Sequence, residues 1–173
     1  MTDRETNPRP KSVLFVCTGN TCRSAMAEAL FRARIQNSHE ADLPDWRIES
    51  AGIWAEEGLP ASKYARAVLD QRGIDIQAHR AKTINRSLVQ EFDLILALSD
   101  DHKEAVQVEY PQIRDRVFML SEMSGEKDPV TDPFGEPLEA YQQTADKIDR
   151  FLESGMDRIL RLVNRYHSDN GAG

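Results

Sequence analysis

Four short segments of the chain have the residue pattern of β-strands: 12–16, 46–50, 92–98 and 116–120. The first and third contain the apolar runs VLFV and LILAL. Nearly continuous apolar runs are typical of strands that are covered on both faces of a sheet. The pattern therefore predicts a sheet that is buried between two layers of helices.

Helix-length segments separate these strands. After Arg23, apolar residues recur at Met26, Ala29, Leu30 and Ala33, and this spacing places them on one face of a helix. Four further segments have the length or apolar spacing of helices: 64–71, 82–91, 101–109, and a last segment that starts near 138 and continues past Gly155 to about 166.

Strands that alternate with helices predict an α/β fold. We expect a three-layer sandwich with a central four-stranded parallel sheet and a phosphate-binding loop after the first strand. The domain is expected over 11–166, with a disordered leader over 1–10 and a flexible tail over 167–173. Ligands of such sheets bind beyond the C-terminal ends of the strands. The sequence CTGNTCRS, which begins at Cys17, occupies such a position.

Composition narrows the possible partners. The 173 residues are 40% hydrophobic and 29% charged, as in an ordinary globular domain. The net charge of −7 offers no basic excess for binding nucleic acid. The sequence has no apolar run of membrane-spanning length and its polar leader is unlike a signal peptide, so we expect a cytoplasmic protein with no membrane partner.

The 18–23 segment reads as a strand-to-helix turn whose backbone N–H groups can converge on one point. Gly19 and Asn20 readily adopt the left-handed conformations that such a nest needs. The following helix adds the positive end of its dipole, and Arg23 adds a guanidinium that can bind an anion with two hydrogen bonds. The 18–23 loop therefore suits a tetrahedral oxyanion such as phosphate.

Cys17 is expected at the floor of this nest, where the same donors favour the thiolate. Ser24 could donate a hydrogen bond to the sulfur. A nucleophile beneath a bound phosphoryl group implies a phosphocysteine intermediate that water hydrolyses in a second step. Positioning and charge stabilisation by the nest and Arg23 would then provide most of the catalysis.

Other interpretations of the two cysteines are less specific. A cysteine at a strand end is often a small buried hydrophobe. Cys17 and Cys22 could begin a zinc site, but the chain has no other cysteine and its four histidines are scattered. A nucleotide loop would need Gly-Lys-Ser/Thr, which is absent. We therefore expect an oxyanion site with no metal and no cofactor.

The run VCTGNTCRSAMAE resembles the signature of the low molecular weight protein tyrosine phosphatase family. The segments SAGIWAEEGLPAS, GIDIQAHRAKTI, FDLILALSDDH and TDPFGEPLEAYQQT follow in the family's order, so the resemblance extends from Lys11 to about Tyr166. It implies that Cys17 is the nucleophile and that Arg23 binds phosphate. It also implies a cradle formed by the backbone of Thr18, Gly19, Asn20, Thr21, Cys22 and Arg23.

The leaving group must be protonated as its bond to phosphorus breaks, which requires an acid at the mouth of the site. Asp-Pro alone is only a turn signal, and it occurs at both Asp128 and Asp132. The family carries its general acid in an Asp-Pro-aromatic segment. Asp132 precedes Pro133 and Phe134, so the resemblance implies Asp132 as the acid and, in the second step, as the base that activates water.

The resemblance also implies supporting residues. Trp54 and Phe134 would form apolar walls, although Trp54 could equally be a core tryptophan. His79 would support the loop through Asn20, with Asn20 and Ser24 as further supports; a lone histidine can also be merely structural.

In the family, a reversible disulfide between the positions of Cys17 and Cys22 protects the nucleophile. Alternatively, Cys22 is a small residue that fills the start of the helix.

The substrate class depends on Thr21. Tyrosine-directed members commonly carry a branched aliphatic residue there, whereas protein arginine phosphatases carry threonine, and phenylalanine after Asp-Pro. Thr21, Phe134 and the run that begins at Tyr141 resemble that branch. The Thr21 hydroxyl could order a water or polarise the P–N centre. We therefore favour phosphoarginine proteins as substrates and inorganic phosphate as product, with phosphotyrosine as the alternative.

Three rival functions fit less well. An arsenate reductase needs resolving cysteines downstream, and none follows Cys22. A non-catalytic phosphate-binding or redox-sensing module would be expected to lack Cys17, Arg23 or Asp132, and all three are present. A nucleotide-binding regulator would need a lysine loop. The residues at 99–101, Ser-Asp-Asp, depart from the family's methionine-containing turn, so contacts from that edge are left open.

Overall fold

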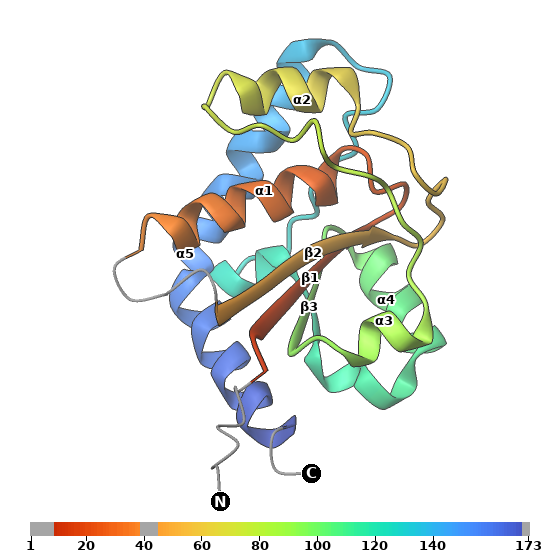
Figure 1. Ribbon diagram of the computed structural model, residues 1–173, viewed down its shortest axis with the longest axis vertical. Coiled ribbons are helices and arrows are strands. Elements are labelled where there is room, and N and C mark those ends of the chain that lie inside the picture. The colour runs from red at the N-terminus through yellow and green to blue at the C-terminus, as the bar shows by residue number, and fades with distance from the viewer. Residues whose placement is uncertain (1–8, 39–44, 171–173) are drawn as a thin grey trace, which may run out of the picture.

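The computed structural model describes residues 9–38 and 45–170, so the expected leader up to residue 8 and the last three residues of the tail lie outside the described residues. Its centre is a four-stranded sheet with strand order β2-β1-β3-β4 (Figure 1). All the strand pairs are parallel. The strands are β1 (Lys11–Cys17), β2 (Trp46–Gly52), β3 (Leu94–Ala97) and β4 (Val117–Met119).

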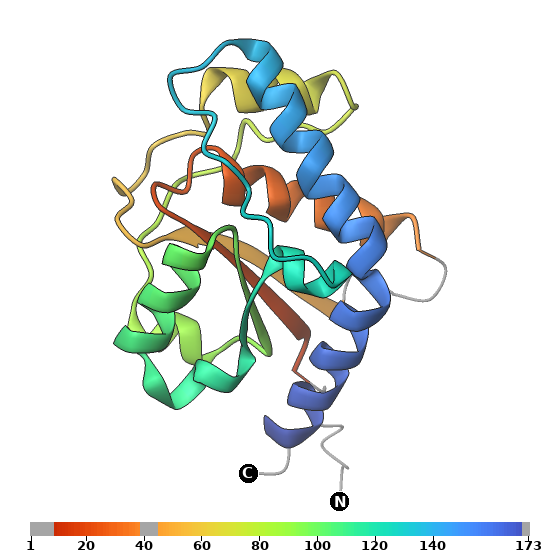
Figure 2. The same cartoon turned by 180° about the vertical axis from the view of Figure 1, so that it is seen from behind.

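Helices cover both faces of the sheet. Figure 1 shows α1, α2 and α5 on one side and α3 and α4 on the other, and Figure 2 shows α5 from behind, along its full length. The α-helices are α1 (Arg23–Gln36), α2 (Lys63–Asp70), α3 (Arg86–Gln90), α4 (Asp100–Glu109) and α5 (Leu138–Asn170). Two 3₁₀-helices, η2 (Pro111–Arg116) and η3 (Leu120–Ser124), flank β4. The predicted three-layer α/β sandwich is confirmed.

Strand β1 holds the centre of the sheet. Its side chains alternate between two hydrophobic clusters: Val13 and Phe15 pack under α1 and α5, whereas Leu14 and Val16 face the α3–α4 side. All four are fully buried. Burial on both faces explains the unbroken apolar run in the sequence. It also fixes the C-terminal end of β1, and therefore Cys17, relative to both layers.

The helix predicted over 82–91 is shorter than expected. Helix α3 begins only after Asn85, whose side chain caps it by accepting a hydrogen bond from the Leu88 N–H. Residues 82–84 instead extend beside the end of β2: the Gly52 N–H donates to Lys82 O (2.8 Å) and the Ile84 N–H donates to Gly52 O (2.9 Å). Hydrogen bonds to β2 therefore replace the first turns of the expected helix.

Helix α5 is longer than expected. It continues to Asn170, so residues 167–170, which the sequence predicted as flexible tail, are helical. His167 Nδ1 lies 3.1 Å from Oδ2 of the buried Asp93, a carboxylate that also accepts a hydrogen bond from the Ser12 N–H and pairs with Arg9. Residues near both ends of the described chain are thus joined at Asp93. None of the helices in the described residues is long and apolar enough to cross a membrane.

Gly155 lies within α5, which continues past it as predicted. A Cβ atom at this position would lie 2.6 Å from Cβ and 3.0 Å from the carbonyl carbon of Met123. The glycine therefore lets α5 pack directly against η3.

We expect Gly155→Ala to lower the free energy of unfolding, measured by urea denaturation. Alanine favours a helix by about 1 kcal/mol over glycine, but overpacking a core costs about 1–3 kcal/mol. The overlap involves backbone atoms of Met123 that cannot rotate away, so overpacking should dominate. Ser154→Ala, at the exposed neighbouring position, is the control and should leave stability unchanged or slightly raised. A Gly155→Ala protein at least as stable as the wild type would contradict this account.

Candidate active site

The 18–23 loop joins the end of β1 to the start of α1 and lies close against the end of β2. Asn20 has a φ of 57°, the left-handed conformation expected of this residue type. A Cβ atom on Gly52 would meet Thr18 O at 2.4 Å and Asn20 N at 3.1 Å. Only glycine therefore permits this approach. The sequence analysis did not single out Gly52. The one signal in the sequence is a glycine shortly after the predicted strand at 46–50.

The carbonyl groups of the loop are bonded away from its centre. Three of them, and that of the preceding Cys17, accept hydrogen bonds from elsewhere in the chain: Cys17 O from Ile53 N (2.9 Å), Thr18 O from Trp54 N (3.0 Å), Asn20 O from His79 Nε2 (2.7 Å) and Thr21 O from Ser62 N (2.9 Å). By contrast, no backbone N–H of residues 18–23 donates to an acceptor within residues 9–38 and 45–170. The N–H groups are therefore available to an anion.

Cys17 lies at the base of this loop and is buried. Its Sγ is 2.9 Å from Ser24 Oγ. The buried Asn20 donates through Nδ2 to Ser24 Oγ (2.8 Å) and to Ser50 Oγ (2.9 Å). Because the Ser24 oxygen accepts from Asn20, its own proton can be directed at the sulfur. The expected supporting positions of Asn20, Ser24 and His79 are thus brought together around the loop.

Ser50 and Glu28 extend this network, and the sequence analysis did not identify either. Ser50 Oγ donates to Glu28 Oε1 at 2.9 Å. Burial raises the pKa of the Glu28 carboxyl, while the hydrogen bond from Ser50 acts in the opposite direction. The side chain of Asn20 is therefore supported from both α1 and β2, since Ser24 lies in α1 and Ser50 lies in β2.

Arg23 is buried at the rim of the loop. Its Nη1 donates to Val130 O (3.1 Å) and its Nη2 lies 3.6 Å from Asp132 Oδ2. Its buried Nε has no hydrogen-bond partner in the described chain. A buried guanidinium with an unused donor suits an incoming anion.

The structure distinguishes the two Asp-Pro candidates. Asp132 lies beside Arg23, is half-exposed, and accepts a hydrogen bond from the Phe134 N–H (3.1 Å). Asp128 is exposed and makes no hydrogen bond or ion pair with the described residues. Val130 joins the Asp132 segment to the core, since its N–H donates to Leu98 O (2.8 Å) beyond β3.

Trp54 and Phe134 are 84% and 74% exposed. The core interpretation of Trp54 is therefore wrong. Trp54 is bonded through its backbone to Thr18, and Phe134 through its backbone to Asp132. Each exposed ring thus belongs to a segment that contacts the loop or Arg23.

Cys22 is a buried free thiol, as is Cys17. Its Sγ donates to Ser62 Oγ (3.3 Å) and lies 3.5 Å from the hydroxyl of Tyr141. Burial, together with the hydrogen bond to Cys22, raises the pKa of Tyr141 to about 12. The expected disulfide with Cys17 stays a prediction.

Thr21 lies half-buried in the loop. The one hydrogen-bond partner of its hydroxyl within the described residues is Cys22 Sγ at 3.8 Å, a long contact that leaves the hydroxyl able to bond elsewhere.

His102 is a further residue at the loop that the sequence analysis did not identify. Its Nε2 lies 2.8 Å from Thr18 Oγ1 and its Nδ1 lies 2.9 Å from Ser99 Oγ. Burial, and to a smaller extent the charge of Arg23, lowers the pKa of His102 to about 4. The residues just before it, 99–101, are those for which the sequence analysis made no prediction about contacts.

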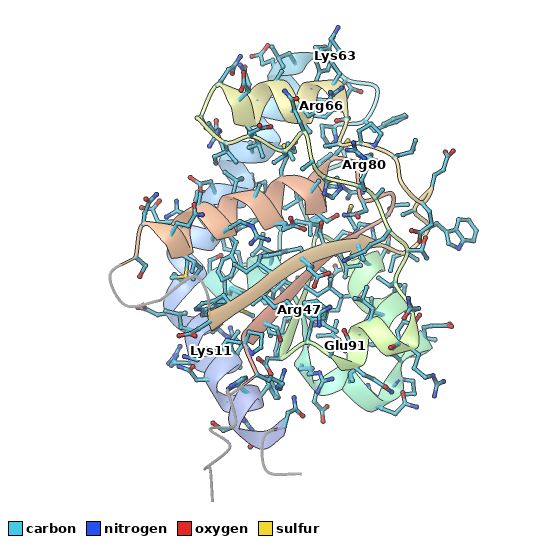
Figure 3. All side chains as sticks on the ribbon, viewed as in Figure 1. Lys11, Arg47, Lys63, Arg66, Arg80 and Glu91 are labelled. Carbon is cyan, nitrogen blue, oxygen red and sulfur yellow. The ribbon has the colours of Figure 1, made fainter. Side chains whose placement is uncertain are left out.

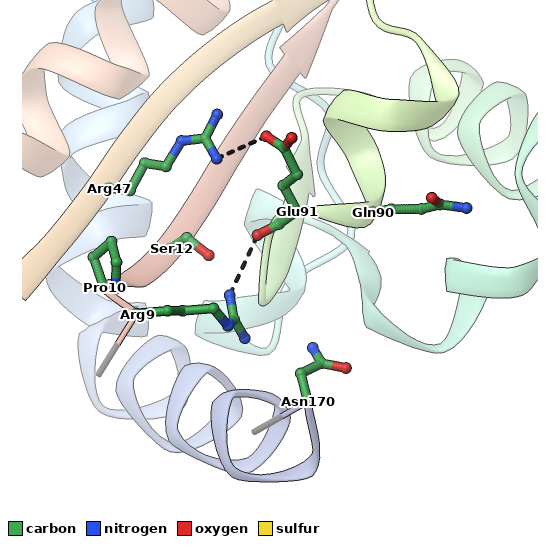
Figure 4. Close-up of a pocket in the computed structure, with 7 residues that line it drawn as sticks. All are labelled: Arg9, Pro10, Ser12, Arg47, Gln90, Glu91 and Asn170. Atoms are coloured by element: carbon green, nitrogen blue, oxygen red, sulfur yellow. Dashed lines mark hydrogen bonds and ion pairs between the residues drawn. The ribbon is translucent and has the colours of Figure 1, made fainter. Parts of the chain in front are cut away.

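A separate cavity of about 470 Å³ lies where β1 begins, at the opposite end of the strand from the loop. Figure 4 shows its lining and the bonds from Arg47 and Arg9 to Glu91, and Figure 3 places Arg47 and Glu91 on the same face. Arg47 Nη1 donates to a Glu91 carboxylate oxygen at 2.8 Å. These charged groups are already paired, so the cavity does not resemble a catalytic site. Nor do residues 9–38 and 45–170 hold a group of acidic, histidine and cysteine side chains arranged for a metal.

Comparison with known proteins agrees with this geometry. Residues 12–165 match the model of the low molecular weight phosphotyrosine protein phosphatase family. A protein-arginine-phosphatase of Geobacillus stearothermophilus is 36% identical over 87% of this chain and 97% of that protein. A probable low molecular weight protein-tyrosine-phosphatase, EpsP, of Ralstonia nicotianae is 38% identical over 88% of this chain and 98% of that protein. The crystal structure of a low molecular weight protein tyrosine phosphatase from T. tengcongensis has 41% identity and a TM-score of 0.79, covering 85% of this chain and 98% of that one. The chain therefore belongs to the low molecular weight phosphotyrosine protein phosphatase family.

Proposed function

We propose that this protein is a phosphoprotein phosphatase that works through a phosphocysteine on Cys17 and acts on phosphoarginine. The observation that carries the proposal is the 18–23 loop. Its N–H groups have no protein acceptor in the described chain, and the loop runs from the buried Cys17 to the buried guanidinium of Arg23. A nest of this kind stabilises the charge that develops on a transferring phosphoryl group.

In the first step, Cys17 Sγ attacks phosphorus as the bond from phosphorus to the leaving group breaks. Asp132 gives its proton to the departing nitrogen or oxygen. Ser24, whose hydroxyl is 2.9 Å from the sulfur, supports the thiolate before attack. The backbone N–H groups and Arg23 hold the three equatorial oxygens.

In the second step, Asp132 takes a proton from water as the water attacks phosphorus. The S–P bond breaks, Cys17 is regenerated as a thiolate, and inorganic phosphate leaves. In the structure, Arg23 Nη2 lies 3.6 Å from Asp132 Oδ2. A bound phosphoryl group competes for that guanidinium, which frees Asp132 to face the leaving group.

Thr21 supports phosphoarginine as the substrate. Among the described residues its hydroxyl contacts only Cys22 Sγ, at 3.8 Å, which leaves it able to bond a water or to interact with the P–N centre. The G. stearothermophilus relative named as an arginine phosphatase supports the same choice. The exposed rings of Trp54 and Phe134, and relatives named as tyrosine phosphatases, favour phosphotyrosine proteins as the second candidate.

We expect Asp132→Asn to slow turnover in proportion to how much protonation the leaving group needs. General acid catalysis contributes about 10²–10⁴-fold. The loss should approach that range for phenyl phosphate and be much smaller for 4-nitrophenyl phosphate, measured as kcat/KM. Asp128→Asn is the matched control, since Asp128 precedes a proline in the same way but makes no contact with Arg23. Equal losses on both substrates would argue against Asp132 as the acid.

The substrate choice is tested by comparing phosphoarginine and phosphotyrosine peptides of one sequence. We expect the wild type to have the higher kcat/KM on phosphoarginine and Thr21→Ile to shift the ratio toward phosphotyrosine. An apolar side chain removes the hydroxyl and adds contact area for a phenyl ring.

Thr21→Ser, which keeps the hydroxyl, serves as the control for this comparison and should retain the wild-type preference. A ratio that does not change in Thr21→Ile would remove the basis for phosphoarginine. A wild type that prefers the phosphotyrosine peptide would favour the second candidate.

A further inference from the structure

His102 is a buried histidine to which the proposed catalytic steps assign no role. It lies in the first turn of α4, which packs against β3 and β4, whereas α1 and the Asn20 network lie on the opposite face. Both of its ring nitrogens have partners: Nε2 is 2.8 Å from Thr18 Oγ1, and Nδ1 is 2.9 Å from Ser99 Oγ. The imidazole therefore bridges the start of α4 and the first residue after the nucleophile.

Thr18 depends on that bridge more than its neighbours do. Asn20 is fully buried and held by four hydrogen bonds of its side chain and carbonyl. Thr18 is exposed, so packing does not fix its side chain. Its carbonyl is held on one side by Trp54 N at 3.0 Å. The bond between its hydroxyl and His102 provides the other attachment.

The surroundings of His102, its burial above all, favour a neutral ring. Burial and Arg23 lower the pKa of His102 to about 4, while Asp101 and Asp132 act in the opposite direction without overcoming them. A neutral imidazole has one donor and one acceptor nitrogen. Hence either the Thr18 hydroxyl donates to Nε2 while Nδ1 donates to Ser99, or the Ser99 hydroxyl donates to Nδ1 while Nε2 donates to Thr18. In both arrangements, each ring nitrogen of His102 makes a hydrogen bond.

We propose that His102 is a positioning residue of the 18–23 loop, which it holds at Thr18 through the hydrogen-bonded chain Ser99–His102–Thr18. It adds no second cation beside Arg23, so its contribution is to geometry rather than to charge. The inference rests on the proposed function, because the geometry that it maintains is that of the phosphoryl cradle.

Two substitutions at one position test the proposal. The amide of His102→Gln reaches the place of Nε2 and can still bond Thr18, whereas the amide of His102→Asn reaches only the place of Nδ1, next to Ser99. A misplacement of about 1 Å at a catalytic site can cost ~10²-fold. We expect His102→Asn to lower kcat/KM roughly 10–100-fold and to weaken binding of inorganic phosphate, and His102→Gln to recover most of both.

A double-mutant cycle with Thr18→Val supplies the second measurement. Thr18→Val removes only the hydroxyl, so it should lower kcat/KM in the wild type but not further in His102→Asn, because the two side chains act through one bond. Thermal unfolding of each variant distinguishes a loss of kcat/KM caused by the missing bond from one caused by a general loss of structure. A merely structural histidine would lower the melting temperature and leave phosphate affinity unchanged, and that result overturns the inference.

Equal kinetic constants for His102→Asn and His102→Gln, or additive effects in the cycle, would also overturn the inference while leaving the proposed function intact. Direct titration of the wild type with inorganic phosphate distinguishes failure of this inference from failure of the proposed function. A wild type that neither binds phosphate nor hydrolyses either phosphopeptide would overturn the proposed function and this inference together.

Discussion

The carbonyl groups of Cys17, Thr18, Asn20 and Thr21 all accept hydrogen bonds from outside the 18–23 loop, and the rest of the site depends on this. When the carbonyls are bonded outward, the N–H groups of the same peptides are left for an anion at the centre. Gly52 permits the arrangement, because any side chain there would collide with Thr18 O. The cradle is therefore a property of the segments around the loop as much as of the loop itself.

The charged groups closest to the rim of this cradle are Arg23 and Asp132. Arg23 is the buried cation at its rim, bonded to Val130 O and close to Asp132. His102 lies near both and has a pKa lowered to about 4, so it contributes no positive charge at neutral pH. One cation and one half-exposed carboxylate suit a reaction in which the phosphoryl group binds the first and the leaving group meets the second.

Much of the fold and part of the site could be predicted from local pattern. The buried runs in β1 and β3, the apolar spacing of α1 and the residues Cys17 and Arg23 lie within short stretches whose chemistry can be recognised without a partner. Two boundaries were wrong, because the cause was distant in the sequence: β2 holds residues 82–84 out of α3, and Asp93 contacts His167 in α5, beyond the predicted end at 166. Asp132 needed the family resemblance, since Asp128 has the same local signal.

The sequence by itself determined the order of strand, loop and helix, and with it the positions of Cys17 and Arg23 at the two ends of the loop. Only the tertiary structure decided what holds them. Ser50, Gly52 and His102 are separated from the loop by tens of residues, and nothing local distinguishes them from ordinary strand and helix residues. They meet the loop because β1 pairs in parallel with both β2 and β3. In parallel strands the C-terminal ends share one edge of the sheet, so the segments that follow them converge on the same place.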